Sequence, residues 1–76
     1  MLDLYKIKKE KDYIIDKLDV DDNIKRRFLD LGIIPGAKIK KVLTDYSQEM
    51  SAYYIMGSLI AIRNKDTKGI KVNYVI

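Results

Sequence analysis

The 76-residue sequence contains no cysteine and no histidine. Without cysteine there can be no disulfide framework, which suits a reducing compartment such as the cytoplasm. The two best side-chain ligands for zinc, iron or copper are missing, so a metal would have to be held by carboxylates alone. The thiol nucleophile and the histidine base of most nucleophilic catalysis are missing as well. We therefore predict a protein that is not an enzyme, with no catalytic residue, no metal ligand and no cofactor.

Long hydrophobic runs and glycine-rich loops are also absent. The uncharged stretch from 51 to 62 is well short of the about 20 residues that a membrane-spanning helix needs. The N-terminus lacks the apolar segment followed by small residues that marks a secretory signal. The four glycines are far apart, so no loop could cradle the phosphates of a nucleotide. These absences predict a cytoplasmic protein that does not insert into the membrane.

The composition is that of a folded domain: 47% of the residues are hydrophobic and 34% are charged. A chain of this length is expected to form one domain, 1–76, with a small core and a thin margin of stability. The formal net charge is +4, and basic and acidic residues are interspersed. Because no long basic block occurs, this charge indicates a solvated surface more than a nucleic-acid-binding one.

The spacing of apolar residues predicts five short strands and one helix. The strands are expected at 12–18, 37–44, 52–56, 59–63 and 70–75, with a helical turn or loop at 64–69. The helix is expected at 23–31. Five strands in so short a chain most economically curl into a barrel, because closure removes exposed strand edges. The predicted fold class is mainly β, a small five-stranded barrel with one α-helix between the first and second strands.

The predicted helix has one apolar face. Ile24, Phe28 and Leu31 are four and then three residues apart, which assigns them to the core. Asp22 is the expected N-cap. Gly32 follows the helix directly, at the position where helices often end in a left-handed residue.

Three further local signals shape the strands. Pro35-Gly36 predicts a turn, and Gly57-Ser58 predicts a type II′ hairpin turn. In the strand 37–44, Ile39 and Leu43 are expected to share one face. Lys41 interrupts that face, so a bulge or a solvated segment is predicted there.

Three clusters of polar or aromatic residues could carry a function. The aspartates at 19, 21 and 22 could form a weak cation site, but helix capping explains them better. Tyr53 and Tyr54 point to opposite faces of a strand, so one of them could bind a Pro-rich peptide or stack on single-stranded nucleic acid. The basic run 25–27 opposes the helix dipole. It is either a docking patch for an acidic partner surface or for phosphate, or a solvated face.

The segment 27–39, RFLDLGIIPGAKI, resembles the signature of the ferrous-iron transport protein A family (FeoA-like), in which an arginine, an apolar helix, Leu-Gly and Pro-Gly precede a strand. Segments 57–63 and 68–72 are similar to the glycine-led hairpin and the closing strand of that family. One departure is Lys9-Glu10, where the family usually has Pro-Gly. Lys41 and Leu59 also depart from the common residue types.

The resemblance implies an SH3-like barrel in the cytoplasm. It also implies an accessory protein that binds the cytoplasmic GTP-binding part of a large FeoB-like membrane transporter. By the matching motif, the expected partner-binding residues are Lys25, Arg26, Arg27, Asp30, Ile33 and Pro35. A small barrel that binds nucleic acid or peptides is the alternative, although no nucleic acid is expected as partner. The sequence leaves open iron sensing, weak self-association and whether the partner is activated or inhibited.

Overall fold

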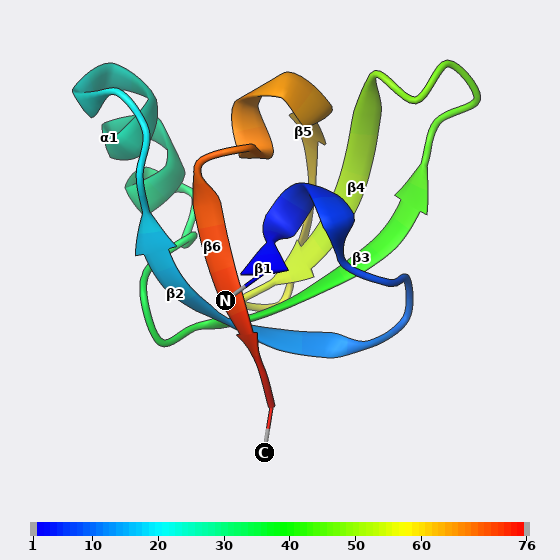
Figure 1. Cartoon of the computed structure of the whole chain (residues 1–76), viewed down its shortest axis with the longest axis horizontal. Coiled ribbons are helices and arrows are strands. Elements are labelled where there is room, and N and C mark those ends of the chain that lie inside the picture. Colours follow the sequence, from blue (N-terminus) through cyan, green and yellow to red (C-terminus); the bar gives the residue numbers. More distant parts are fainter. Residues whose placement is uncertain (1, 76) are drawn as a thin grey trace.

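The computed structural model describes residues 2–75, which form one antiparallel sheet of six strands, one α-helix and two 3-10 turns (Figure 1). In chain order the elements are β1 (Leu2–Asp3), η1 (Leu4–Lys6), β2 (Asp12–Leu18), α1 (Asp22–Asp30), β3 (Lys38–Thr44), β4 (Met50–Ile55), β5 (Ser58–Arg63), η2 (Asn64–Thr67) and β6 (Ile70–Tyr74). The mainly β class with one helix is confirmed. The strand count is six because β1, too short to show a periodic signal, pairs with β6.

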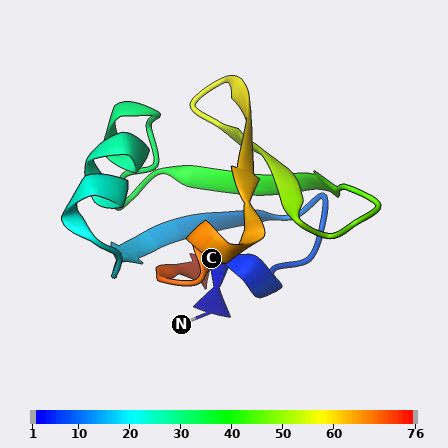
Figure 2. The ribbon, with the colours of Figure 1, turned by 90° about the horizontal axis from the view of Figure 1, so that it is seen from above.

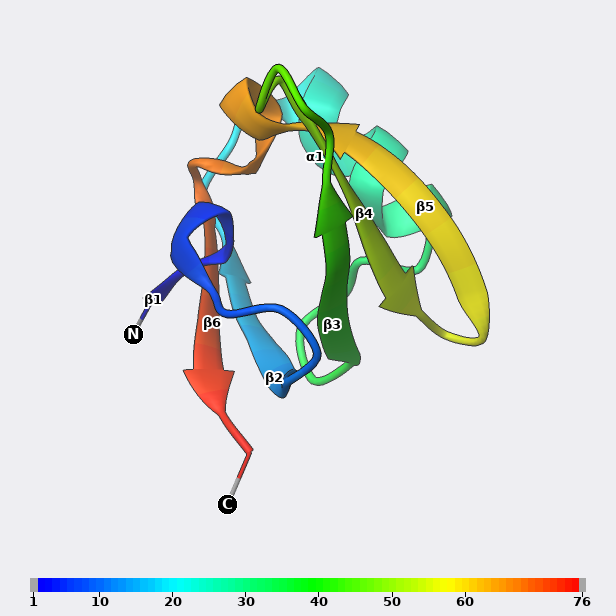
Figure 3. The same ribbon diagram turned by 90° about the vertical axis from the view of Figure 1, so that its right-hand side faces the viewer.

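The sheet curls strongly but does not close (Figure 3). Its strand order is β1-β6-β2-β3-β4-β5, and within residues 2–75 the outer strands β1 and β5 do not pair with each other. The expected removal of all strand edges is therefore wrong. The chain leaves β5 directly into η2, and η2 lies in contact with η1. The short turns that follow β1 and β5 therefore contact each other at the opening of the sheet.

The core lies inside this curled sheet, where buried residues of β2 to β6 meet and Leu2 of β1 packs against them partly buried. The N-terminal segment contributes Leu4 and Ile7, which lie outside every predicted strand and helix. Asp3 holds the start of the chain by an ion pair with Lys71 of β6, and this hydrogen bond lowers the pKa of the carboxyl. The buried hydrophobic cluster consists of Leu4, Ile7, Tyr13, Ile15, Leu18, Phe28, Ile33, Ala37, Ile39, Tyr53, Ile55, Ile62, Ile70 and Val72.

The predicted bulge in β3 is confirmed, since the register with β4 shifts between Lys41 and Leu43. A bulge reverses the inside–outside alternation of the residues that follow it. Consequently Ile39 is buried while Leu43 is half exposed, and the expectation that they share one face is wrong. Lys41 turns inward instead. Its Nζ donates a hydrogen bond to the carbonyl of Tyr5 at 3.2 Å.

We expect the stability of the protein to rise with pH because of Lys41. Burial and the neighbouring charge of Lys9 lower the pKa of this amine from its ordinary 10.5. The unfolded chain therefore binds more protons than the folded one between the lowered pKa and 10.5, and stability rises with pH across that window. Urea unfolding of the wild type and of Lys41→Met measures the effect. The variant should show a flatter pH profile between pH 7 and about 10, and parallel profiles would contradict this assignment.

Both predicted turns exist, but one is displaced. Pro35-Gly36 forms a turn in which the backbone amide of Ala37 donates a hydrogen bond to the carbonyl of Ile34 at 3.1 Å. Gly36 has a φ of +94°. The β4–β5 turn is centred on Met56 and Gly57, both at positive φ, not on Gly57-Ser58. Because Ser58 already pairs with Ile55 as a strand residue, the type II′ prediction is wrong. Two positive φ values are typical of a type I′ hairpin.

The departure at Lys9-Glu10 leaves the backbone path intact. Glu10 adopts a φ of +62°, a left-handed conformation that favours glycine. Its amide donates to the carbonyl of Lys41 at 2.8 Å. The chain thus forms a glycine-type turn without a glycine.

Candidate docking surface

α1 stands at one side of the curled sheet and is held there by a single buried side chain (Figures 1 and 2). Phe28 is 4% exposed, and Ile24 packs partly against the core. Both placements agree with the predicted apolar face. Leu31 is 45% exposed, so its assignment to the core is wrong. The helix ends at Asp30, and the chain turns away before Leu31 can point inward.

A Schellman motif ends the helix. Gly32, at φ +93°, donates from its amide to the carbonyl of Leu29 at 3.1 Å. The amide of Ile33 donates to the carbonyl of Phe28 at 2.9 Å. This is the paired bonding that a left-handed glycine permits, and it brings the next hydrophobic residue against the last helical turn. The predicted left-handed end at Gly32 is therefore confirmed.

The same motif buries Ile33 completely. Ile33 therefore cannot contact a partner while the turn is folded, and we withdraw it from the predicted docking residues. The sequence held the signal: an apolar residue directly after the terminal glycine is typical of the hydrophobic contact in a Schellman motif. The burial of Ile33 fixes the direction in which the chain leaves the helix.

The other five expected docking residues are all exposed: Lys25, Arg26, Arg27, Asp30 and Pro35. Within residues 2–75 the only ion pairs are Lys40–Asp12 and Lys71–Asp3, so the three cations of α1 have no carboxylate partner there.

The start of α1 is poorly capped. Its N-cap is Asp21, not the expected Asp22, and the Asp21 side chain makes no capping hydrogen bond. Asp22 lies in the first turn, where its charge interacts favourably with the helix dipole. The carboxylates near the helix start thus act on its dipole. Among the described residues no group of three potential ligands gathers closely enough to hold a metal ion.

An apolar patch that sequence reasoning missed adjoins the helix end. Leu31 and Ile34 flank Gly32 in the chain, and both are exposed. Met56, at the tip of the β4–β5 hairpin, packs over Gly32: a Cβ built on that glycine would lie 3.1 Å from the Met56 Cγ. Met56 is 68% exposed. Sequence separation hid this contact, because nothing local indicates that the hairpin tip reaches the helix end.

Tyr53 and Tyr54 point to opposite faces as predicted, with Tyr53 fully buried and Tyr54 half exposed. The hydroxyl of Tyr53 makes no hydrogen bond to any atom of residues 2–75, and burial raises its pKa. Only Tyr54 of this pair could stack on a base or a proline. No helix within residues 2–75 combines the length and apolar character needed to cross a bilayer.

Several solved structures resemble this fold closely. The FeoA protein of Chlorobium tepidum has a TM-score of 0.91 at 23% identity, over 99% of this chain and 71% of that one. The zinc complex of Stenotrophomonas maltophilia FeoA has a TM-score of 0.83 at 18% identity, over 96% of this chain and 91% of that one. It is described as a procaryotic SH3 domain protein with a suggested role as a ferrous iron transport activating factor. The structure of ScaR with bound zinc has a TM-score of 0.86 at 19% identity, over 99% of this chain but only 37% of that one.

These likenesses show an SH3-like fold. No curated protein sequence matches the chain. The family model of the FeoA domain matches residues 2–74, nearly the whole chain. The chain therefore belongs to the FeoA domain family.

Proposed function

We propose that the chain is a non-enzymatic, cytoplasmic accessory protein of ferrous iron uptake, and that it binds the cytoplasmic GTP-binding part of a FeoB-like membrane transporter. The family and the fold support the association with iron transport. One observation carries the docking proposal: three cations on the outer side of α1 have no partner within residues 2–75 and lie next to an exposed apolar patch. We call this surface the helix face; it comprises Lys25, Arg26, Arg27, Asp30, Leu31, Ile34, Pro35 and Met56.

The helix face has the composition of a protein interface. Interfaces of this kind combine a desolvated apolar centre with a charged rim, and arginine is enriched among the residues that dominate affinity. Leu31, Ile34 and Met56 would form the centre, and Arg26 and Arg27 the rim. The Schellman motif and the buried Phe28 hold the helix rigidly. A rigid surface loses less conformational entropy on binding.

We expect Arg26→Glu with Arg27→Glu to weaken binding to the purified cytoplasmic domain of the transporter by about 10-fold to 100-fold. The reason is that each change replaces an attraction to acidic partner groups by a repulsion. Isothermal titration calorimetry with the full chain measures the effect. The matched control is Lys8→Glu with Lys17→Glu, which makes the same change of charge at exposed positions outside the helix face. Equal affinity of both double variants, each confirmed folded by circular dichroism, would contradict the proposal.

A further inference from the structure

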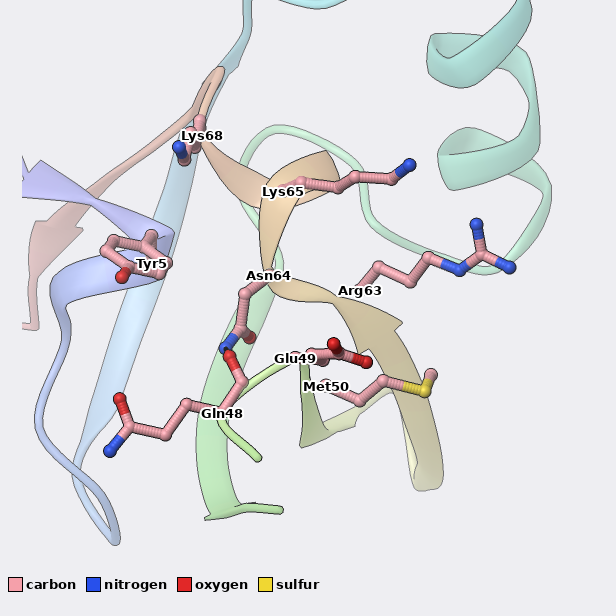
Figure 4. A pocket seen from close by; sticks show the side chains of 8 residues that line it. All are labelled: Tyr5, Gln48, Glu49, Met50, Arg63, Asn64, Lys65 and Lys68. Carbon is pink, nitrogen blue, oxygen red and sulfur yellow. Dashed lines mark hydrogen bonds between the residues drawn. The ribbon is translucent and has the colours of Figure 1, made fainter. Parts of the chain in front are cut away.

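A hollow within residues 2–75 has a lining that shares no residue with the helix face, although a smaller hollow lined by Arg27, Leu31, Met50 and Arg63 lies between the two surfaces. The larger hollow lies between η1, the segment before and at the start of β4, the end of β5 and η2 (Figure 4). Its volume is about 610 Å³, which is within the range of ligand-binding clefts. The lining residues are Tyr5, Gln48, Glu49, Met50, Arg63, Asn64, Lys65 and Lys68. We call this hollow the η2 groove.

The wall of the η2 groove is held by hydrogen bonds that centre on one buried residue. Asn64 donates from Nδ2 to the carbonyl of Gln48 at 2.6 Å and accepts at Oδ1 from the Ser51 hydroxyl at 2.7 Å. The Thr67 hydroxyl donates to the backbone carbonyl of Asn64 at 2.8 Å, and the backbone amide of Asn64 donates to the backbone carbonyl of Glu49 at 2.7 Å. These bonds join η2 to the segment before β4, so the groove exists before any ligand arrives.

The loop that leads into this wall is also ordered. Asp45 accepts hydrogen bonds from the Ser47 hydroxyl at 2.9 Å and from the Glu49 amide at 3.1 Å. These bonds lower the pKa of its carboxyl, the Ser47 hydroxyl having the largest effect. The hydrogen bond from the Glu49 amide to Asp45 keeps the backbone of Glu49 in position.

The rim of the groove is cationic. Arg63, Lys65 and Lys68 line it and are exposed, and none has a carboxylate partner within 4.0 Å in residues 2–75. Glu49 is the only acidic lining residue, so the lining carries an excess of two positive charges. The exposed ring of Tyr5 closes one side, with the Lys68 Nζ 5.9 Å from the ring centroid. Figure 4 shows Tyr5 and Lys68 on one side and Lys65 and Arg63 directed to the other.

The charge and shape favour an extended anionic chain over a compact phosphate. No glycine lines the groove, so it lacks the closely spaced backbone amides that usually surround phosphate groups. The cations are instead separated from one another, with Lys68 beside Tyr5 and with Lys65 and Arg63 directed to the other side, as separated carboxylates would require (Figure 4). Tyr5 and Met50, which lie on opposite sides of the groove, add apolar surface to its lining (Figure 4).

We propose that the η2 groove binds a short acidic peptide segment of a protein partner, in which apolar side chains between carboxylates contact Tyr5 and Met50. The carboxylates pair with Arg63, Lys65 and Lys68. This site goes beyond the proposed function, because none of its lining residues belongs to the helix face. Either proposal can therefore fail without the other.

The test is a titration of the ¹⁵N-labelled chain, followed by chemical shifts, with a capped peptide of sequence EDLEYDE. Its amide counterpart QNLQYNQ removes the charges and keeps the shape. We expect EDLEYDE to shift the amides of Tyr5, Lys65 and Lys68, and QNLQYNQ to shift them little. Lys65→Glu with Lys68→Glu should weaken binding by about tenfold or more, since two attractions become repulsions. Lys25→Glu with Arg26→Glu, which carries the same charge change on the helix face, should weaken it by less than about threefold.

Three results would overturn the proposal. If the two double variants weakened peptide binding equally, the attraction would depend on the net charge of the protein and not on the groove. Equal binding of the amide peptide would remove the carboxylates from recognition. Inorganic phosphate that shifts the same amides at the same concentration would assign the groove to small anions. Amide spectra of the unliganded variants establish that each is folded, so loss of binding cannot be confused with loss of structure.

Discussion

Phe28→Ala is expected to lower the free energy of unfolding by about 3–5 kcal/mol, which is close to the whole stability of a domain this small. Phe28 is the only fully buried side chain of α1, and its carbonyl accepts the hydrogen bond that closes the Schellman motif. Alanine leaves a cavity between the helix and the core, and no second buried side chain holds the helix in place. The loss therefore includes the anchoring of the helix face.

Urea unfolding followed by circular dichroism measures this change. The matched control is Leu29→Ala, one residue later on the same helix, where the side chain is 40% exposed. Alanine also has a slightly higher helix propensity than leucine, so the control should change stability by less than about 1 kcal/mol. If Phe28→Ala unfolds at the same urea concentration as the control, the ring does not anchor the helix.

Gly69→Ala is expected to cost roughly 3 kcal/mol or more, although the added group is one methyl. Its Cβ would lie 2.0 Å from the backbone carbonyl oxygen of Asp19 and 2.7 Å from a methyl carbon of Val20. The backbone oxygen cannot rotate away as a side chain could. The same residue is also tied to Gly69, because the backbone amide of Asp19 donates a hydrogen bond to the Gly69 carbonyl at 2.7 Å. Room for the methyl requires β2 and β6 to separate where the chain leaves the sheet.

Gly36→Ala provides the contrast. Gly36 has a φ of +94°, and a Cβ there would meet nothing within 4 Å. That variant should cost only about 1–2 kcal/mol, the strain of a left-handed alanine. Thermal unfolding measures the stability lost in each variant. It compares the steric clash in Gly69→Ala with the backbone strain in Gly36→Ala. A Gly69→Ala protein more stable than Gly36→Ala would mean that the two segments can move apart freely.

Local signals predicted the helix and its end well. The spacing of Ile24 and Phe28, followed by Gly32 and the Pro-Gly turn, depends on residues within about one or two helical turns of each other. β2 was predicted with its observed bounds for the same reason. The β4–β5 turn lies one residue earlier than predicted, because Met56 occupies a left-handed position that glycine or asparagine usually takes. β1 was missed, since two residues cannot show a period.

The candidate sites depended more on tertiary structure. Exposure of the basic helix side followed from the amphipathic pattern, and it is observed. Leu31 and Ile33 exchanged their expected places, because the end of the helix decides which residue points inward. The η2 groove could not be predicted at all. Its residues come from the N-terminal segment, the start of β4 and η2, which are far apart in sequence.

By itself the sequence determined the absence of cysteine and histidine chemistry, the single amphipathic helix and the glycine that ends it. These depend on residue type and on neighbours in the chain. Only the tertiary structure decided that the sheet stays open, that Met56 covers Gly32, and that Tyr5 meets the cations around η2. Such contacts arise when the curled sheet brings distant segments together to bury a common core. A local pattern carries no information about which distant segment will be its neighbour.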